Sequence, residues 1–215
     1  MAEIVQYEAR YPAAIITLNS PDTRNALSIP MLEAIATAFE KAENDAGVRA
    51  IIFTGAGSAF CAGMDLKELR AALDSLKFDK DGAVWESALR GEELIDRVFK
   101  SLKPTIAAVN GAATAGGAGL LSACDMVVAV QEARIGYPEM KVGIQAGMVL
   151  LHLMRLVGER QARYPILTGD LIPAAQAKEI GLINEVVARE ELIPTALRWV
   201  NSIALNGPKA EVISK

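Results

Sequence analysis

The sequence has little of the chemistry that metal centres and histidine-based catalysts need. Its 215 residues include one histidine, His152, and two cysteines, Cys61 and Cys124. The cysteines lack the spacing of a metal site, and a single histidine argues against zinc. A triad of the chymotrypsin type would have to use that one histidine. We therefore expect no metal site.

Long apolar runs and long basic runs are also absent. No window reaches the roughly 18 to 20 apolar residues of a membrane-spanning helix, and Met1–Gln6 lacks the pattern of a secretory signal. We therefore expect no membrane span and a cytoplasmic location, with the mitochondrial matrix as the alternative. The net charge is −4. Nucleic acid is not expected as a partner, because phosphate binding usually leaves a basic surface.

The composition that remains is that of a globular protein. Hydrophobic residues make up 52% and charged residues 22% of the chain, which excludes a disordered protein. The length suffices for one domain with a substantial core, so we expect a single domain over residues 1–215. Apolar segments at 50–54, 105–109 and 125–130 alternate with helical periodicity, which indicates an α/β fold.

Further elements follow from the same periodicities and from turn residues. We expect strands at Ile4–Ala9, Ala14–Leu18 and Ile183–Val187, and helices at 92–102, 148–156, 159–167, 173–180 and 191–205. Ser28 precedes Pro30, which predicts a helix start there. Gly47 predicts the end of that helix.

Two glycine-rich turns stand out. In Ile106–Asp125 a buried strand leads through such a turn into a helix of small residues, which can lie close to a ligand. Gly57–Asp65 follows the strand Ala50–Thr54 and also ends at a predicted helix start. N–H groups in the first turn of a helix lack helical partners, so two such units can aim two donors at one oxyanion. Taken alone, a turn of this kind is usually only a turn.

Several short motifs occur together in one order along the chain. They are Asn25–Leu27, Phe60–Leu66, Lys103–Gly111, Ala115–Gly117, Ala123–Asp125, Pro138-Glu139, Leu156–Gly158, Leu167–Gly169 and Gly181–Asn184. In this combination the sequence resembles the enoyl-CoA hydratase/isomerase (crotonase) family over nearly its whole length. The resemblance implies a spiral of ββα units with C-terminal helices, assembled as a homotrimer or hexamer. Because the chain stops at Lys215, we expect the C-terminal trimerisation helices to be shortened.

The resemblance also implies a site for an acyl-CoA. The oxyanion hole would consist of the N–H groups of Ala62 and Gly116. The substrate contacts would be Arg24, Ala26, Ala62, Gly63, Met64, Asp65 and Gly116. CoA is part of the substrate, so we expect no separate cofactor.

One departure from the family bears on the reaction. Hydratases of the family activate water with two glutamates, whose positions here are Gly119 and Glu139. Isomerases that convert 3-enoyl-CoA to 2-enoyl-CoA resemble this pattern better, because some keep only the second glutamate. Glu139 would then move a proton from C2 to C4. An apolar pocket, for which Ile135, Tyr137 and Met140 are suited, would raise its pKa and make it a better base.

Other reactions and other site residues stay open. Hydration of a 2-enoyl-CoA, decarboxylation or another enolate reaction, and a non-catalytic acyl-CoA-binding or interaction subunit are the alternatives. Without the resemblance, Glu139 is a surface charge after a turn proline.

The remaining candidates have ordinary structural interpretations. His152 lies among apolar residues and is expected to be buried or half-buried. Cys61 is expected to be a small buried residue and Asp65 a helix cap. Lys67 and Arg70 are either contacts of CoA phosphates or exposed helix charges. The segment 143–148 departs from the hydratase pattern, which predicts a differently shaped acyl pocket.

Overall fold

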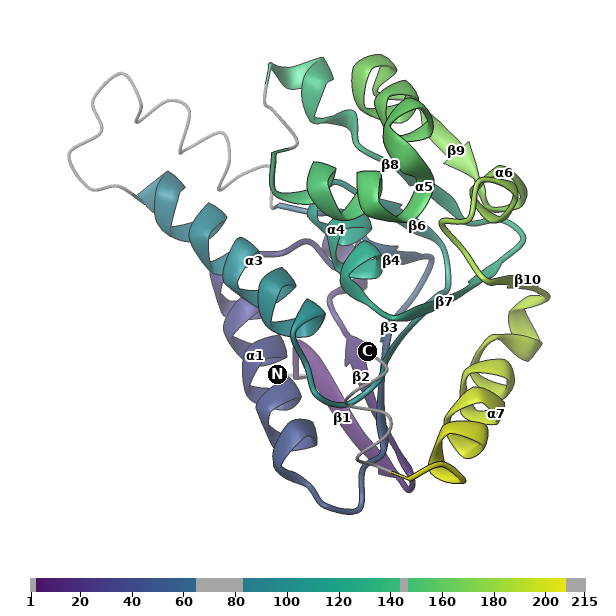
Figure 1. Ribbon diagram of the computed structural model, residues 1–215. Coiled ribbons are helices and arrows are strands. Elements are labelled where there is room, and N and C mark those ends of the chain that lie inside the picture. The colour runs from purple at the N-terminus through teal and green to yellow at the C-terminus, as the bar shows by residue number, and fades with distance from the viewer. Residues whose placement is uncertain (1–2, 65–82, 144–146, 208–215) are drawn as a thin grey trace.

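The computed structural model describes residues 3–64, 83–143 and 147–207. Asp65, Lys67 and Arg70 lie outside these ranges. So do residues 144–146, which belong to the segment 143–148 that was predicted to shape the acyl pocket. Two sheets, one of six strands and one of four, form the centre of the described chain, and helices lie around them (Figure 1).

The six-stranded sheet contains all six predicted strands. In spatial order its strands are β1 (Val5–Arg10), β2 (Ala13–Leu18), β3 (Ala50–Gly55), β5 (Thr105–Val109), β7 (Met126–Val130) and β10 (Glu185–Val187). The β1–β2 pair is antiparallel and the other pairs are parallel. All five residues of β5 are buried, as expected for an apolar run in a parallel sheet covered on both faces.

The four-stranded sheet was not predicted. Its order is β4 (Ala59–Cys61), β6 (Ala112–Thr114), β8 (Arg134–Gly136) and β9 (Leu171–Pro173). Each strand has three residues, too few for a period-two pattern to be visible in the sequence. This sheet nevertheless positions the site, because the segments that leave β4, β6 and β8 carry the candidate functional groups.

The helices of the described residues follow these strands. They are α1 (Ile29–Asn44), α3 (Ala83–Phe99), α4 (Gly116–Ala123), α5 (Gly147–Thr168), α6 (Ala174–Glu179) and α7 (Leu192–Ala204), with short 3-10 turns η1 (Pro21–Thr23), η2 (Pro138–Val142) and η3 (Arg189–Glu191). The order β5–β6–α4, then β7–β8–α5, repeats a strand of each sheet followed by a helix. The α/β fold built from ββα units is therefore confirmed.

Some predicted helix boundaries agree with the structure and others do not. The Ser28 hydroxyl caps α1 by accepting the Met31 N–H at 3.3 Å, which confirms the predicted start. The helix α3 begins earlier than predicted and ends at Phe99, so Leu102 lies outside it and is 67% exposed. Gly158, with φ 77° and ψ 161°, kinks α5 and divides it where two helices were predicted. This backbone region is open essentially only to glycine.

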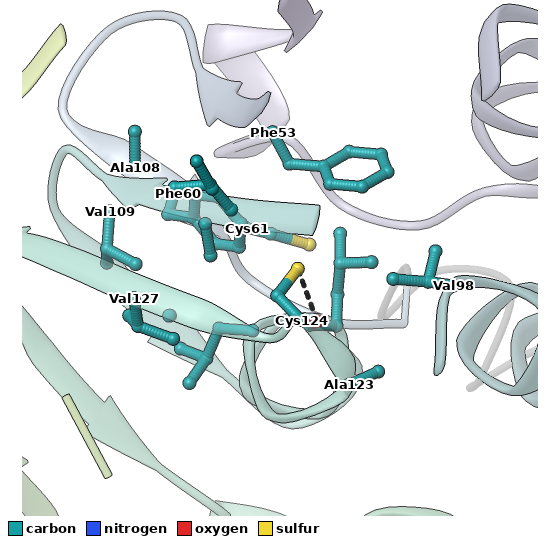
Figure 2. Packing of buried hydrophobic residues seen from close by; sticks show 14 of the residues in the cluster. Phe53, Phe60, Cys61, Val98, Ala108, Val109, Ala123, Cys124 and Val127 are labelled. Atoms are coloured by element: carbon teal, nitrogen blue, oxygen red, sulfur yellow. Dashed lines mark hydrogen bonds between the residues drawn. The ribbon is translucent and has the colours of Figure 1, made fainter. Parts of the chain in front are cut away.

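One part of the hydrophobic core lies between β3, β4, α3 and α4. Figure 2 shows Phe53, Phe60 and Val98 packed around the two cysteines. Cys61 is 0% exposed and Cys124 is 5% exposed, and the two thiols are not joined in a disulfide. Burial raises the pKa of the Cys61 thiol to about 12, so it stays protonated and behaves as the small buried residue that was predicted.

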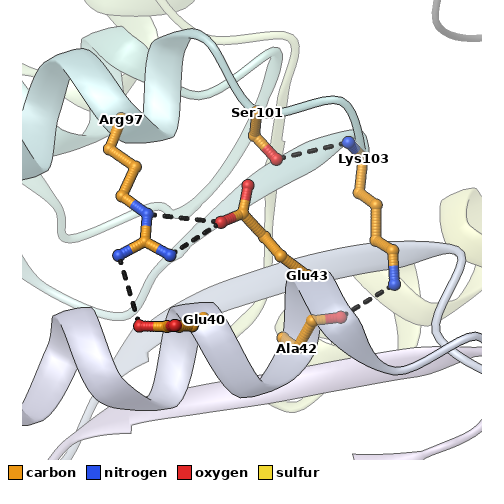
Figure 3. A network of polar contacts seen from close by, with 6 residues as sticks. All are labelled: Glu40, Ala42, Glu43, Arg97, Ser101 and Lys103. Carbon is orange, nitrogen blue, oxygen red and sulfur yellow. Dashed lines mark hydrogen bonds and ion pairs between the residues drawn. The ribbon is translucent and has the colours of Figure 1, made fainter.

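Polar contacts between α1 and α3 lie at the surface. The Arg97 guanidinium donates to the Glu43 carboxylate at 3.1 Å and pairs with Glu40 at 3.8 Å, and Lys103 donates to the Ala42 carbonyl at 2.8 Å (Figure 3). Such partly exposed ion pairs contribute about 0–1 kcal/mol each. The apolar contacts therefore dominate this helix pair. Across the described residues, no helix combines the length and the apolar character needed to cross a membrane.

Candidate active site

Two loops lie side by side at the edge of the four-stranded sheet. The Ala62 N–H donates to the Arg24 carbonyl at 3.0 Å, and the Leu27 N–H donates to the Gly63 carbonyl at 2.7 Å. Leu27 and Met64 also form an isolated parallel bridge. The structure thus brings segments 24–27 and 62–64 together, and with them all the predicted substrate contacts that it describes in these loops.

A buried asparagine fastens this pair of loops. Asn25 is 0% exposed and has a left-handed φ of 57°. Its side-chain Nδ2 donates to the carbonyls of Ala56, Ala59 and Phe60 at 3.0, 2.9 and 3.2 Å, and its Oδ1 accepts the Ser20 N–H at 2.9 Å. Sequence reasoning used Asn25 only as part of a motif. The polar loop that contains Asn25 holds no glycine, and the sequence gives no sign that this side chain would bind the distant turn at 55–60.

Asn110 holds the same turn from its other side. Its Oδ1 accepts the Gly55 N–H at 3.0 Å, and its Nδ2 donates to the carbonyls of Gly57 and Ala59, both at 3.1 Å. Asn110 follows β5 and precedes β6, the strand that leads to α4. The two asparagines therefore connect the loop at 62–64 to the segment that carries Gly116.

The loop at 62–64 lies directly against the start of α4. A Cβ built on Gly63 would lie 3.0 Å from the Gly116 nitrogen and 2.6 Å from the Ala115 Cβ. Only a glycine allows this approach. Gly116 is the first residue of α4 and half-buried, so its N–H has no acceptor within the helix. Gly116 thus lies beside the loop at 62–64, and its role as an oxyanion donor stays a prediction.

The prediction for Ala62 as the second oxyanion donor is wrong in this structure. Its N–H is already bonded to the Arg24 carbonyl. The backbone N–H of Gly63 faces the Cys61 thiol and lowers the pKa of that thiol slightly against the effect of burial. The N–H of Met64 is the next along the loop, and it has no acceptor among the residues that the structure describes. A sequence cannot reveal this difference, because the acceptor for Ala62 comes from a distant segment.

Glu139 lies in η2, directly after β8. Its side chain is half-buried, and Oε2 is a buried atom without a hydrogen-bond partner among the described residues. Burial raises the pKa of the Glu139 carboxyl, an effect that a bond from its own backbone N–H partly offsets. Ile135 and Tyr137 are 0% exposed, whereas Met140 is 44% exposed and does not join them. A half-buried carboxylate with an unpartnered oxygen has the character of a general base.

Comparison with known proteins identifies the family and the fold. The family described as enoyl-CoA hydratase/isomerase matches residues 9–215. The chain belongs to the enoyl-CoA hydratase/isomerase family. A short-chain-enoyl-CoA hydratase of Clostridium acetobutylicum is 38% identical over 204 residues, which are 94% of this chain and 76% of that protein. The chain is thus an enzyme of the hydratase/isomerase family.

Solved structures of family members agree in fold. An enoyl-CoA hydratase from Bacillus anthracis superposes with a TM-score of 0.91 at 33% identity, over 99% of this chain and 81% of that one. An enoyl-CoA hydratase/isomerase from Xanthobacter autotrophicus gives a TM-score of 0.90 at 38% identity, over 100% and 78%. Both cover the strands and turns that form the site.

The resemblance places the first hydratase glutamate at Gly119, and the structure leaves no room for a side chain there. A Cβ on Gly119 would overlap Val149 Cγ1 and would lie 2.9 Å from Ile95 Cδ1. Val149 belongs to α5 and Ile95 to α3, and they are 2% and 3% exposed. Two apolar side chains thus fill the space next to Gly119. Sequence reasoning noticed the missing glutamate but could not name the residues that replace it.

His152 has a structural environment. Its ring packs edge-on against Phe99, with 4.9 Å between ring centroids. Burial and the nearby Arg155 lower the pKa of His152, and Asp96 raises it by a smaller amount. The prediction of a half-buried helix histidine is confirmed. Within the described ranges, no group of three His, Cys, Asp or Glu residues is placed to hold a metal ion.

Proposed function

We propose that this enzyme moves a double bond in an unsaturated acyl-CoA by proton transfer through one carboxylate. Conversion of 3-enoyl-CoA to 2-enoyl-CoA is the favoured reaction. Two observations carry the proposal: the space beside Gly119 is filled by apolar side chains, and Glu139 Oε2 is a buried carboxylate oxygen without a hydrogen-bond partner among the described residues. With one carboxylate there is a base for the substrate but no second group to share a water molecule.

The proposed reaction uses the groups that the fold brings together. The thioester oxygen accepts the N–H groups of Met64 and Gly116. Glu139 takes a proton from C2, and the electrons of that C–H bond shift to the thioester oxygen and form a dienolate. Glu139 returns the proton at C4, and the double bond then lies between C2 and C3. CoA leaves as part of the product, so we propose that no cofactor takes part.

The two donors stabilise the charge that forms in the transition state. One oxyanion donor typically contributes about 10²–10³ in rate. The raised pKa of the Glu139 carboxyl brings it nearer to that of the acid it must ionise, which favours proton transfer. Burial of the Glu139 carboxyl therefore makes it a stronger base.

Absorbance separates the two main reactions. Isomerisation of a 3-enoyl-CoA creates conjugation with the thioester and raises ultraviolet absorbance, whereas hydration of a 2-enoyl-CoA removes it. We expect a rise with the 3-enoyl substrate and a much slower fall with the 2-enoyl substrate. A faster fall with the 2-enoyl substrate would overturn the isomerase assignment in favour of hydration, the reaction named for the Clostridium relative.

A single substitution tests the base. We expect Glu139→Gln to lower turnover by at least about 100-fold, because a carboxamide cannot take up the C2 proton. Binding of acyl-CoA, measured by calorimetry, should persist because the thioester contacts are backbone groups. Glu132→Gln is the matched control, since Glu132 is an exposed glutamate after β7. Normal turnover by Glu139→Gln would contradict the assignment of the base.

A further inference from the structure

A buried hydrogen bond joins α4 to the segment that carries Glu139. The hydroxyl oxygens of Ser122 and Tyr137 are 3.1 Å apart, and these residues are 4% and 0% exposed. The Ser122 hydroxyl donates its hydrogen to the Ala118 carbonyl at 2.8 Å. The Tyr137 hydroxyl is therefore the donor to Ser122. The bond is directional and shielded from water.

The turn that carries Glu139 makes few other hydrogen bonds or ion pairs with the rest of the protein in the described chain. Gly143 bonds back within the turn, to the carbonyls of Glu139 and Met140. Lys141 pairs with Asp170 at 3.7 Å, but both are exposed, and such a pair contributes little. The turn also lies against α5. In the described chain, the buried hydrogen bonds that hold this segment to the rest of the protein are made by residues before Glu139.

The strand β8 pairs with β6 and β9, and two further hydrogen bonds lead from this segment to one helix. The Gly136 carbonyl accepts the Ala115 N–H at 2.9 Å, next to the first residue of α4. The Tyr137 hydroxyl reaches Ser122, near the other end of the same helix. The base-bearing turn is thus attached to α4 at both ends of the helix that begins with Gly116.

We propose that Tyr137 is a positioning residue, which holds Glu139 at a set distance from the Gly116 N–H through its hydrogen bond to Ser122. The inference rests on the proposed function. A substrate whose thioester oxygen lies at Gly116 presents C2 and C4 at set distances, and one carboxylate must reach both. A misplacement of about 1 Å can cost about 100-fold in rate. Removal of the hydroxyl leaves the ring and its packing in place.

Paired substitutions test the bond. We expect Tyr137→Phe and Ser122→Ala each to lower kcat about tenfold, with the KM for acyl-CoA within about twofold of the parental value. The double variant should be no slower than the slower single variant, because both remove one bond. A kcat within twofold of the parental value in Tyr137→Phe would overturn the proposal. So would a double variant whose loss is the product of the two single losses.

Two controls separate positioning from stability. Tyr7→Phe removes a buried tyrosine hydroxyl without a partner among the described residues, on β1, and should leave kcat unchanged. Thr105→Val removes a buried hydroxyl bonded to the Asp125 carboxylate at 2.9 Å, at the far end of β5. It should lower the melting temperature as much as Tyr137→Phe without lowering kcat. An equal loss of kcat in Thr105→Val would show a general stability effect and overturn the proposal.

Amide hydrogen exchange tests the attachment without any substrate. Exchange of the Gly143 amide should accelerate at least about tenfold in Tyr137→Phe and Ser122→Ala, and should not change in Thr105→Val. Unchanged exchange would overturn the proposal whatever the reaction is. If instead Glu139→Gln turns over normally, the proposed function fails. A normal kcat in Tyr137→Phe beside an inactive Glu139→Gln overturns the positioning role alone.

Discussion

At the scale of single residues, the chemistry depends on what surrounds each polar group. Glu139 and Glu132 have the same side chain, yet one is half-buried with an unpartnered oxygen and the other is exposed. The N–H groups of Ala62 and Met64 are identical in kind, but the first is bonded to Arg24 and the second has no acceptor in the described chain. Burial and hydrogen bonding, not residue type, select the groups that can act on a substrate.

The raised pKa of the Glu139 carboxyl predicts a pH-dependent cost in stability. Because its pKa is higher in the folded state, the folded protein binds more protons than the unfolded chain between the two pKa values. The free energy of unfolding therefore falls as pH rises through that window. We expect Glu139→Gln to be more stable than the parental protein at pH 8 and about equally stable at pH 3.5, in urea titrations at both pH values.

The exposed Glu132 supplies the reference for that comparison. Glu132→Gln should change stability by the same small amount at both pH values. If Glu139→Gln were less stable than the parental protein at pH 8, the buried carboxylate would not be a source of strain, and the argument for an activated base would lose its support.

At the scale of elements, short connections and close contacts place the functional groups. The loop at 62–64 approaches α4 closely because Gly63 has no side chain, and Asn25 and Asn110 hold the preceding turn. The turn carrying Glu139 leaves the three-residue strand β8. None of these connections depends on a long element, so helix propensity alone does not place the groups.

Substitution of Asn25 tests the contribution of its buried amide. Asn25→Gly keeps the left-handed backbone available but removes the bonds to three carbonyls and the bond from the Ser20 N–H, and we expect a loss of about 2–3 kcal/mol. Asn25→Ala should lose about 1 kcal/mol more, because a Cβ disfavours φ of 57°. Urea unfolding measures both. Asn19→Ala removes one exposed amide bond to Glu3 and should cost less than about 1 kcal/mol; an equal loss would contradict the special role of Asn25.

The close packing at Gly119 is tested by a compensating pair. Gly119→Ala should lower the free energy of unfolding by about 1–3 kcal/mol, because the new Cβ overlaps Val149. The double variant Gly119→Ala/Val149→Ala should lose less than the sum of its two single variants, since the smaller side chain makes room. Gly119→Ala combined with Val127→Ala, on β7, should be additive. Additivity of the Val149 pair would contradict the contact.

At the scale of the whole molecule, two sheets bring distant segments to one site. Helices cover the six-stranded sheet except at its largely exposed edge strand β1, and the four-stranded sheet lies at the ends of its parallel strands. The successive ββα units present segments 62–64, 115–119 and 137–143 along this smaller sheet. Its parallel pairs, β4–β6 and β6–β8, set the order in which these segments meet the substrate.

We propose that the chain assembles as a homotrimer or hexamer, as the family resemblance implies. Large apolar side chains are exposed along α5, with Leu151 at 72% and Leu167 at 67%, and an apolar surface of this kind often marks an interface. Light scattering after size exclusion should give three or six times the 22.9 kDa of one chain. A mass of 22.9 kDa that persists at high protein concentration would contradict the proposal.

Much of the fold could be predicted because its signals are local. The strands at 50–54 and 105–109 are uninterrupted apolar runs, and Ser28 with Pro30 marks the start of α1. The four-stranded sheet was missed because its three-residue strands form only against one another. Leu102 was assigned to a helix because its spacing continued the apolar stripe, although Phe99 ends α3.

The sequence by itself determined the alternation of strands and helices and the two glycine-rich turns. It also determined that, of the two positions where hydratases carry a glutamate, Glu139 keeps the carboxylate and Gly119 has no side chain. Each of these depends on residue type and on near neighbours along the chain. Only the tertiary structure decided that Ala62 is bonded to Arg24, that Val149 and Ile95 fill the space beside Gly119, and that burial raises the pKa of Glu139. The reason is physical: an acceptor, a close contact or a low-dielectric surrounding is supplied by segments far away in the sequence.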